Sequence, residues 1–98
     1  MLYEISREYL DEITRAVAVN QTPKSDEELY GLIQAALEDI SRQGAEVIDP
    51  QDPSIKHAVK LYCKGNYGHD NRPDFIERYK NLSAAIALDH NYKAGDAE

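Results

Sequence analysis

Apolar residues recur along the chain at spacings of three and four positions, and no segment alternates convincingly between apolar and polar residues. Spacings of three and four place apolar side chains on one face of an α-helix. Four segments show them, separated by stretches that contain proline or glycine: residues 6–19, 26–43, 53–67 and 74–89. Residues 46–49 are the only weak strand candidate and are too few to build a sheet. The sequence therefore predicts an all-α fold, a small bundle of four helices.

Capping residues and proline mark the starts and stops of the first two helices, and Ser6 is suited to cap the first. Pro23 is expected to keep the two helices apart, because proline disfavours a helical conformation in the residue before it. Ser25 and Glu28 match a capping box, so the second helix is expected to begin at residue 26. Gly44 is a natural left-handed stop after that helix. The apolar faces of these helices comprise Leu10, Ile13, Val17, Leu29, Leu32, Ile33, Ala36, Leu37 and Ile40.

Similar signals delimit the last two helices. Asp52 followed by Pro53 is typical of an N-cap with proline at the first helical position. Gly65 is expected to weaken the end of the third helix, by about 1 kcal/mol relative to alanine. Gly68 is expected to terminate it, and the fourth helix is expected to start near Pro73. The apolar faces comprise Ile55, Ala58, Val59, Tyr62, Cys63, Phe75, Tyr79, Leu82, Ala85 and Ile86.

The composition is that of a single small domain spanning residues 1–98, with frayed ends expected at 1–5 and 94–98. The net charge of −7 argues against tight nonspecific binding to duplex DNA, which requires clustered cations. A single cysteine cannot form an internal disulfide, which favours a reducing cytosol. The acids near the N-terminus do not match a signal peptide, and no apolar run approaches the length of a membrane span.

The stretch "HAVKLYCKGNYGHDN" holds most of the candidate chemistry. His57, Cys63 and His69 follow one another at intervals of six residues. Six residues rotate by about 240° on a helix, so His57 and Cys63 cannot converge on one metal ion. We expect a surface histidine, a buried core cysteine and a loop histidine. Neither a nucleophile motif nor a phosphate-binding loop is present, so we expect no enzyme, no metal and no cofactor.

Charge is unevenly distributed along the chain. Residues 24–49 contain seven acids and two bases, a net charge of −5, whereas residues 50–72 have a net charge of +2. Lys56, Lys60 and Lys64 recur every four residues and form one stripe on the third helix, called here the lysine stripe. The stripe is either a solvated helix face or a contact with DNA or with an acidic surface on another subunit.

Seven tyrosines and no tryptophan are too many aromatic hydroxyls for a small core to bury entirely. Tyr30 falls beside the apolar face of the second helix, a position that suits either a subunit interface or the rim of a core. The candidate interface residues are Lys56, Lys60, Lys64, Glu27, Glu28, Glu38, Asp39 and Tyr30.

Three segments in order resemble a known family: "DEELYGLIQAALEDI", "IKHAVKLYCKGNYGHDN" and "FIERYKNLSAAIALDHNYK". The chain resembles the small head–tail connector (adaptor) proteins, often labelled DNA-packaging proteins, of tailed phages and prophages of Gram-positive bacteria. Residues 58–71 and the ending "ERYKNLSAAIAL" with the later tyrosine are the most specific parts. The resemblance covers about residues 6–93, and it matches the first helix only by pattern.

The resemblance implies an all-helical structural virion protein that assembles with itself as a ring below the portal. Such a ring extends the DNA channel, helps to complete the head after packaging, and has no catalytic residues. The implied partners are the portal protein and a tail-side head-completion protein, while DNA passes without sequence-specific binding. The implied locations are the host cytoplasm during assembly and then the head–tail junction. The alternative is a small helical DNA-binding or regulatory module.

A ring of this kind makes a physical demand that the charge pattern would meet. Head-to-tail contacts join two different surfaces of each subunit. An acidic second helix facing a basic third helix on the neighbouring subunit would supply such a pair. A net charge of −7 also suits a channel that DNA slides past without being held.

Overall fold

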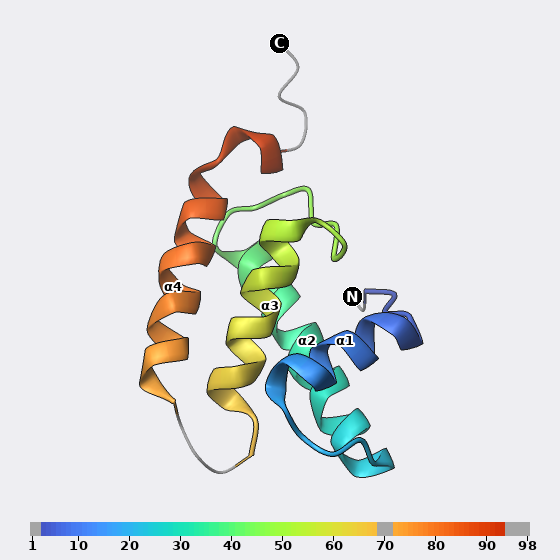
Figure 1. The fold of residues 1–98 in the computed structure, drawn as a ribbon. Helices are drawn as coiled ribbons and strands as arrows, with labels where there is room; N and C mark the ends of the chain where they lie inside the picture. The colour runs from blue at the N-terminus through green and yellow to red at the C-terminus, as the bar shows by residue number, and fades with distance from the viewer. Residues whose placement is uncertain (1–2, 69–71, 94–98) are drawn as a thin grey trace.

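The computed structural model describes residues 3–68 and 72–93. These residues contain four α-helices and no strand, so the predicted all-α fold is confirmed (Figure 1). The elements in order are α1 (Arg7–Val17), α2 (Pro23–Arg42), α3 (Pro53–Asn66), α4 (Pro73–Leu88) and the short 3-10 helix η1 (His90–Tyr92).

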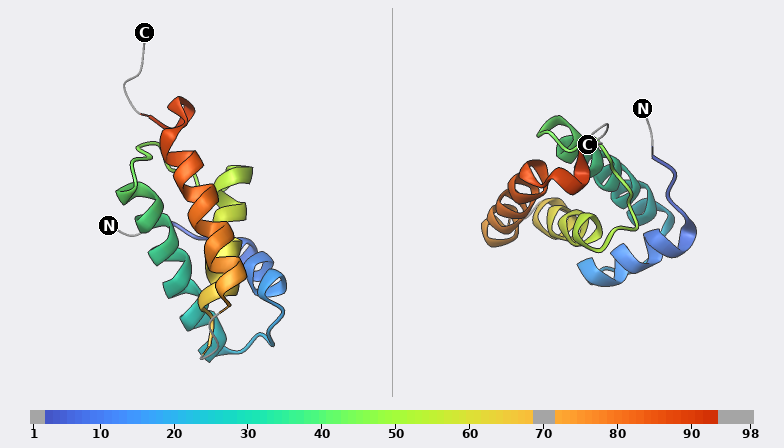
Figure 2. Two further views of the ribbon diagram at one scale, coloured as in Figure 1. Left: turned by 90° about the vertical axis from the view of Figure 1, so that its left-hand side faces the viewer. Right: turned by 90° about the horizontal axis from the view of Figure 1, so that it is seen from above.

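The two middle helices form the centre of the bundle. α2 and α3 each contact the other three helices, and α1 and α4 lie on opposite sides of this pair (Figures 1 and 2). The apolar faces meet between them, which is how short amphipathic helices gain stability. The largest fully buried side chains are Ile13, Leu29, Ile33, Leu37, Ile40, Ile55, Val59, Cys63 and Ser83.

Most of the predicted core positions are buried, and the exceptions lie at the edges of the helix faces. Leu32, Tyr62, Phe75 and Leu82 are half-buried against the core. Ala85 is exposed, so its placement on the apolar face was wrong. Four apolar positions outside the predicted faces are buried in addition: Tyr9, Ala45, Leu61 and Ala87.

The predicted start of the second helix was wrong by three residues. α2 begins at Pro23, and Thr22 is its N-cap, with φ −138° and ψ 163°. The Thr22 hydroxyl accepts a hydrogen bond from the Ser25 amide at 3.0 Å, and the Ser25 hydroxyl accepts one from the Thr22 amide at 2.9 Å. Proline holds the preceding residue extended, which is the conformation that an N-cap needs, and its own fixed φ suits the first helical position. Glu28 is left free of the cap.

Other boundaries differ by one or two residues. α1 ends at Val17 because Ala18 adopts a left-handed conformation, with φ 65°, and its amide donates to the carbonyls of Thr14 and Arg15. The predicted caps Ser6 and Asp52 are confirmed, since each side chain accepts from a backbone amide at the start of its helix. Gly44 and Gly68 have positive φ angles of 131° and 77°. Gly44 follows the C-cap Gln43 of α2, whereas α3 already ends at its extended C-cap Tyr67, before Gly68.

Gly65 lies in the last turn of α3, as expected, and it has in addition a packing role that the sequence did not predict. Gly65 is buried within α3, where a Cβ atom would lie 2.7 Å from Cγ1 of Ile76 in α4. One turn away, the rings of Tyr62 and Tyr79 pack edge to face with centroids 5.0 Å apart. Gly65 therefore allows α3 and α4 to approach closely.

The C-terminal end of the described chain folds back over the α2–α3 connector. The Tyr92 carbonyl accepts hydrogen bonds from the amides of Glu46 and Val47 at 2.6 and 2.8 Å. The Tyr92 hydroxyl donates to Asp52, the N-cap of α3, at 2.8 Å. Lys93 donates to the Gly44 carbonyl at 2.6 Å. These bonds fix the end of α4 to the start of α3.

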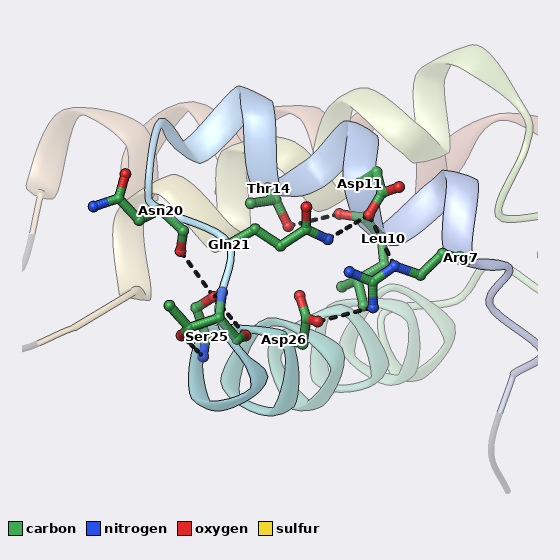
Figure 3. Close-up of polar contacts among 9 residues, drawn as sticks. Arg7, Leu10, Asp11, Thr14, Asn20, Gln21, Ser25 and Asp26 are labelled. Atoms are coloured by element: carbon green, nitrogen blue, oxygen red, sulfur yellow. Dashed lines mark hydrogen bonds and ion pairs between the residues drawn. The ribbon is translucent and has the colours of Figure 1, made fainter.

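Polar contacts hold α1 and the preceding segment against α2. Arg7 pairs with Asp26 at 2.8 Å, and Gln21 donates to Asp11 at 2.6 Å (Figure 3). The amide and carbonyl of Tyr3 both bond to the Gln34 side chain, at 2.8 and 2.7 Å. The chain is therefore already anchored at Tyr3, within the segment expected to fray, whereas residues 94–98 lie outside the described residues.

Candidate functional site

Two residues of the lysine stripe bind an acid of the same chain. The ammonium groups of Lys56 and Lys60 contact the two carboxylate oxygens of Glu12 in α1, at 3.1 and 2.8 Å. Lys56 also lies over the ring of Tyr9, 5.4 Å from its centroid. Because these side chains are only 20% and 28% exposed, the stripe is partly covered by α1. Lys56 and Lys60 thus join α3 to α1.

The two lysines change the acidity of the Glu12 carboxylate. Hydrogen bonds from Lys60 and Lys56 hold the pKa of Glu12 below its ordinary value. A polar recess of about 300 Å³ adjoins the three charged groups, and His57 and Gln51 form part of its wall. The positive charges of Lys56 and Lys60 beside this recess are thus partly balanced by Glu12 of the same chain.

Lys64, the third residue of the stripe, has a different environment. Its ammonium group lies over the Phe75 ring, 5.4 Å from the centroid, and the Arg78 guanidinium lies over the same ring at 5.8 Å. Neither cation forms an ion pair with an acid in the described part of the chain. Together they stand beside a groove of about 440 Å³, also lined by Leu61 and Leu82. We call this the α3–α4 groove.

The candidate acids of α2 are not equivalent either. Glu27 is exposed, whereas Glu28 accepts a hydrogen bond from the Gly68 amide at 3.0 Å. Glu38 pairs with Arg42 at 3.8 Å. Asp39 accepts hydrogen bonds from Gln43, at 2.8 Å, and from the Tyr79 hydroxyl. Asp39 is therefore committed to contacts within the subunit.

Around Asp39 the contacts continue between α2 and α4. The Ser83 hydroxyl donates to the Gln43 side chain at 3.2 Å, and Gln43 lines a recess of about 570 Å³ together with Tyr62 and Tyr79. Burial, reinforced by the hydrogen bond to Asp39, raises the pKa of Tyr79. The Tyr79 hydroxyl thus remains protonated and acts as a hydrogen-bond donor that links the two helices.

Tyr30 stands out on the outer face of α2. Its side chain is 38% exposed, one helical turn from Glu27. Gly31 follows it, and no atom of the described chain outside its own helix backbone and neighbours would lie within 4 Å of a Cβ at that position. The outer face of α2 therefore combines an acid, an exposed aromatic ring and a gap.

The cysteine and histidine of α3 are not brought together. Cys63 is fully buried, and burial raises the pKa of its thiol to about 12. His57 is exposed, and His69 lies outside the described residues. Within residues 3–68 and 72–93, no three His, Cys, Asp or Glu side chains gather in a way that would hold a metal ion.

Comparison of the chain with models of known protein families, with curated proteins and with solved structures finds no match. In the part of the chain that the structure describes, no helix is both long enough and apolar enough to cross a membrane. The function is therefore inferred from the residues and contacts above.

Sequence reasoning missed two members of the site. Glu12 lies on the first helix, 44 residues before Lys56, so only the packing of α1 against α3 reveals its role. Arg78 comes three residues after Phe75, a spacing at which helical side chains meet, but the approach of Lys64 from α3 is set by the helix pair. The spacing of Phe75 and Arg78 was therefore the one feature of the sequence that could have indicated this part of the site.

Proposed function

We propose that the protein is a structural subunit of a phage head–tail junction, which assembles as a ring below the portal and extends the DNA channel. In this role it would act in the host cytoplasm during assembly and then reside in the virion. Its partners would be other copies of itself, the portal protein and a tail-side head-completion protein.

The observation that carries this proposal is the sequence resemblance, which is most specific in residues 58–71 and 77–88. Residues 58–66 and 77–88 lie in α3 and α4, where Gly65 lies against Ile76 and the Tyr62 and Tyr79 rings meet. The residues that carry the resemblance thus include those that fix the geometry of one helix pair. That is expected of residues that preserve the shape of an assembly unit rather than a reactive site.

The charges are also compatible with this role. A net charge of −7 disfavours retention of DNA that moves through a channel. The alternative, a small DNA-binding or regulatory module, would need the cations of α3 to reach phosphates. Lys56 and Lys60 would first have to leave Glu12, which leaves Lys64 as the one unpaired member of the lysine stripe among the described residues.

The mass of the protein in solution, measured at several concentrations with and without a portal ring, tests the proposal. We expect species much larger than the 11.1 kDa chain, at least when the portal is present. A protein that stays monomeric and does not bind the portal would contradict it.

Duplex DNA separates the proposal from its alternative. At moderate salt we expect no measurable binding, because the net charge of −7 opposes the approach of phosphates. Binding with a steep salt dependence would favour the DNA-binding module instead.

A further inference from the structure

The α3–α4 groove carries two cations that form no ion pair with an acid among the described residues. The ion pairs of the described chain involve four of its 11 basic residues, Arg7, Arg42, Lys56 and Lys60. Lys64 and Arg78 converge instead on one ring, at 5.4 and 5.8 Å from its centroid, although Asp74 and Glu77 line a recess together with Arg78. Two like charges beside one aromatic ring attract an anionic group.

The floor of the groove is apolar. Leu61 is 5% exposed, and Phe75 and Leu82 are half-buried beside it. An apolar floor with a cationic rim fits a partner that offers an aromatic or aliphatic side chain together with a carboxylate. A partner surface with acids alone would leave the apolar floor of the groove unfilled. A purely apolar partner surface would leave Lys64 and Arg78 without an anionic partner.

The outer face of α2 offers that combination. Glu27 is exposed and makes no ion pair among the described residues, and Tyr30, one turn later, is 38% exposed. Gly31 lowers the intrinsic stability of the helix relative to alanine, yet nothing in the described chain would contact a Cβ there. Gly65 is explained by its contact with Ile76, but no contact among the described residues explains Gly31. A gap at Gly31 would let another chain approach α2 closely.

These two surfaces cannot meet within one chain. The recess on one side of the α3–α4 pair is lined in part by Asp39 and Gln43 of α2, whereas the α3–α4 groove is lined by α3 and α4 alone. The groove therefore opens away from α2. Two complementary surfaces on different sides of a subunit produce head-to-tail contacts, which close into rings or continue as filaments.

We propose that the α3–α4 groove of one copy receives the outer face of α2 of a second copy. Glu27 would lie between Lys64 and Arg78, and Tyr30 would rest on the apolar floor. This contact rests on the proposed function, in that it is the subunit contact of the ring. In this contact the two cations are Lys64 and Arg78. Lys56 and Lys60, which the sequence also suggested for the interface, bind Glu12 of their own chain.

Charge reversal on each surface tests the contact. K64E/R78E alters only the groove, and E27K/Y30S alters only α2. We expect each variant to raise the concentration at which larger species appear by about tenfold or more. A mixture of the two should assemble further than either variant alone, because one native pair of surfaces remains between them and the two reversed surfaces carry opposite charges. R15E/K80E is the matched control, with the same change in net charge at two exposed positions outside both surfaces, and it should assemble like the wild type.

Disulfide trapping extends the test to a weak contact. Y30C and N81C place thiols on α2 and on the groove wall, while the native Cys63 is buried. Under mild oxidation, a mixture of Y30C and N81C should form heterodimers at least about tenfold faster than a mixture of Y30C and R15C. Equal rates, or wild-type assembly by K64E/R78E, would overturn the proposed contact.

The two experiments separate this contact from the proposed function. If the wild type and K64E/R78E both assemble on the portal, the contact is wrong and the function stands. If Y30C and N81C couple selectively but no larger species forms with the portal, the contact stands and the function is wrong. If neither assembly nor selective coupling occurs, both are wrong.

Discussion

Gly65 of α3 and Ile76 of α4 approach so closely that α3 has no room for a methyl group at position 65. A Cβ on Gly65 would lie 2.7 Å from Cγ1 of Ile76 and 3.2 Å from its backbone nitrogen. A side chain can move away, but the backbone nitrogen moves only if α4 moves. The distance between α3 and α4, and with it the width of the α3–α4 groove, therefore depends on this glycine.

Gly65→Ala should destabilise the protein by about 1–3 kcal/mol, although alanine is the better helix former. Gly31→Ala is its matched control, because Gly31 is exposed in α2 and a Cβ there meets nothing within 4 Å. That variant should gain up to about 1 kcal/mol from helix propensity. Urea denaturation of the two variants checks the prediction. Equal effects of the two substitutions would show that the close approach carries no cost.

Local rules predicted the caps but not the close approach of the helices. Ser6 and Asp52 were correctly identified because an N-cap depends only on the residues that follow it. Ser25 was expected to be the N-cap with Glu28 as its partner, but it is the N3 residue of a capping box whose N-cap is Thr22. The packing role of Gly65 was not predicted, because the residue it contacts lies on another helix.

The candidate site likewise combines features that local sequence predicts with features that only the packing of the helices determines. The three members of the lysine stripe are equivalent by spacing, and only the positions of α1 and α4 distinguish them. Lys56 and Lys60 bind Glu12, whereas Lys64 lies over Phe75. Periodicity assigns residues to a face of a helix, but the neighbour that covers that face is a property of the whole fold.

Glu12 should contribute to stability in a way that depends on pH. Its pKa is lowered in the folded protein by hydrogen bonds from Lys60 and Lys56. Its contribution is therefore complete above the unfolded pKa of a glutamate, about 4.3, and is lost as the pH falls through the lower folded value. Glu12→Gln should be less stable than the wild type at neutral pH, and the two should converge in strong acid.

Thermal denaturation of both proteins from neutral pH to about pH 2 measures this difference, which isolates Glu12 from the other acids of the chain. Glu27→Gln is a suitable control, because Glu27 is exposed and no ion pair of this residue is present among the described residues. A difference between wild type and Glu12→Gln that stays constant with pH would contradict the prediction.

Cys63 should be unreactive in the folded protein. It is fully buried, and a pKa of about 12 in place of the ordinary 9.0 lowers the thiolate fraction at about pH 8 roughly a thousandfold. The thiolate is the species that reacts with alkylating agents. Iodoacetamide should therefore modify the native protein at least about a thousandfold more slowly than the urea-unfolded chain, as followed by mass spectrometry. Comparable rates would mean that the region around α3 opens readily.

The lysine stripe should divide into residues that serve the fold and one that serves assembly. K56E/K60E would place two further carboxylates beside Glu12, so we expect a lower melting temperature together with poorer assembly. K64E/R78E removes two cations that contact only the Phe75 ring, so its melting temperature should change little while assembly is lost. Calorimetry and sedimentation on the same samples separate the two effects. If K56E/K60E melts like the wild type, the Glu12 contacts add nothing to stability, and Lys56 and Lys60 return as candidates for the subunit contact.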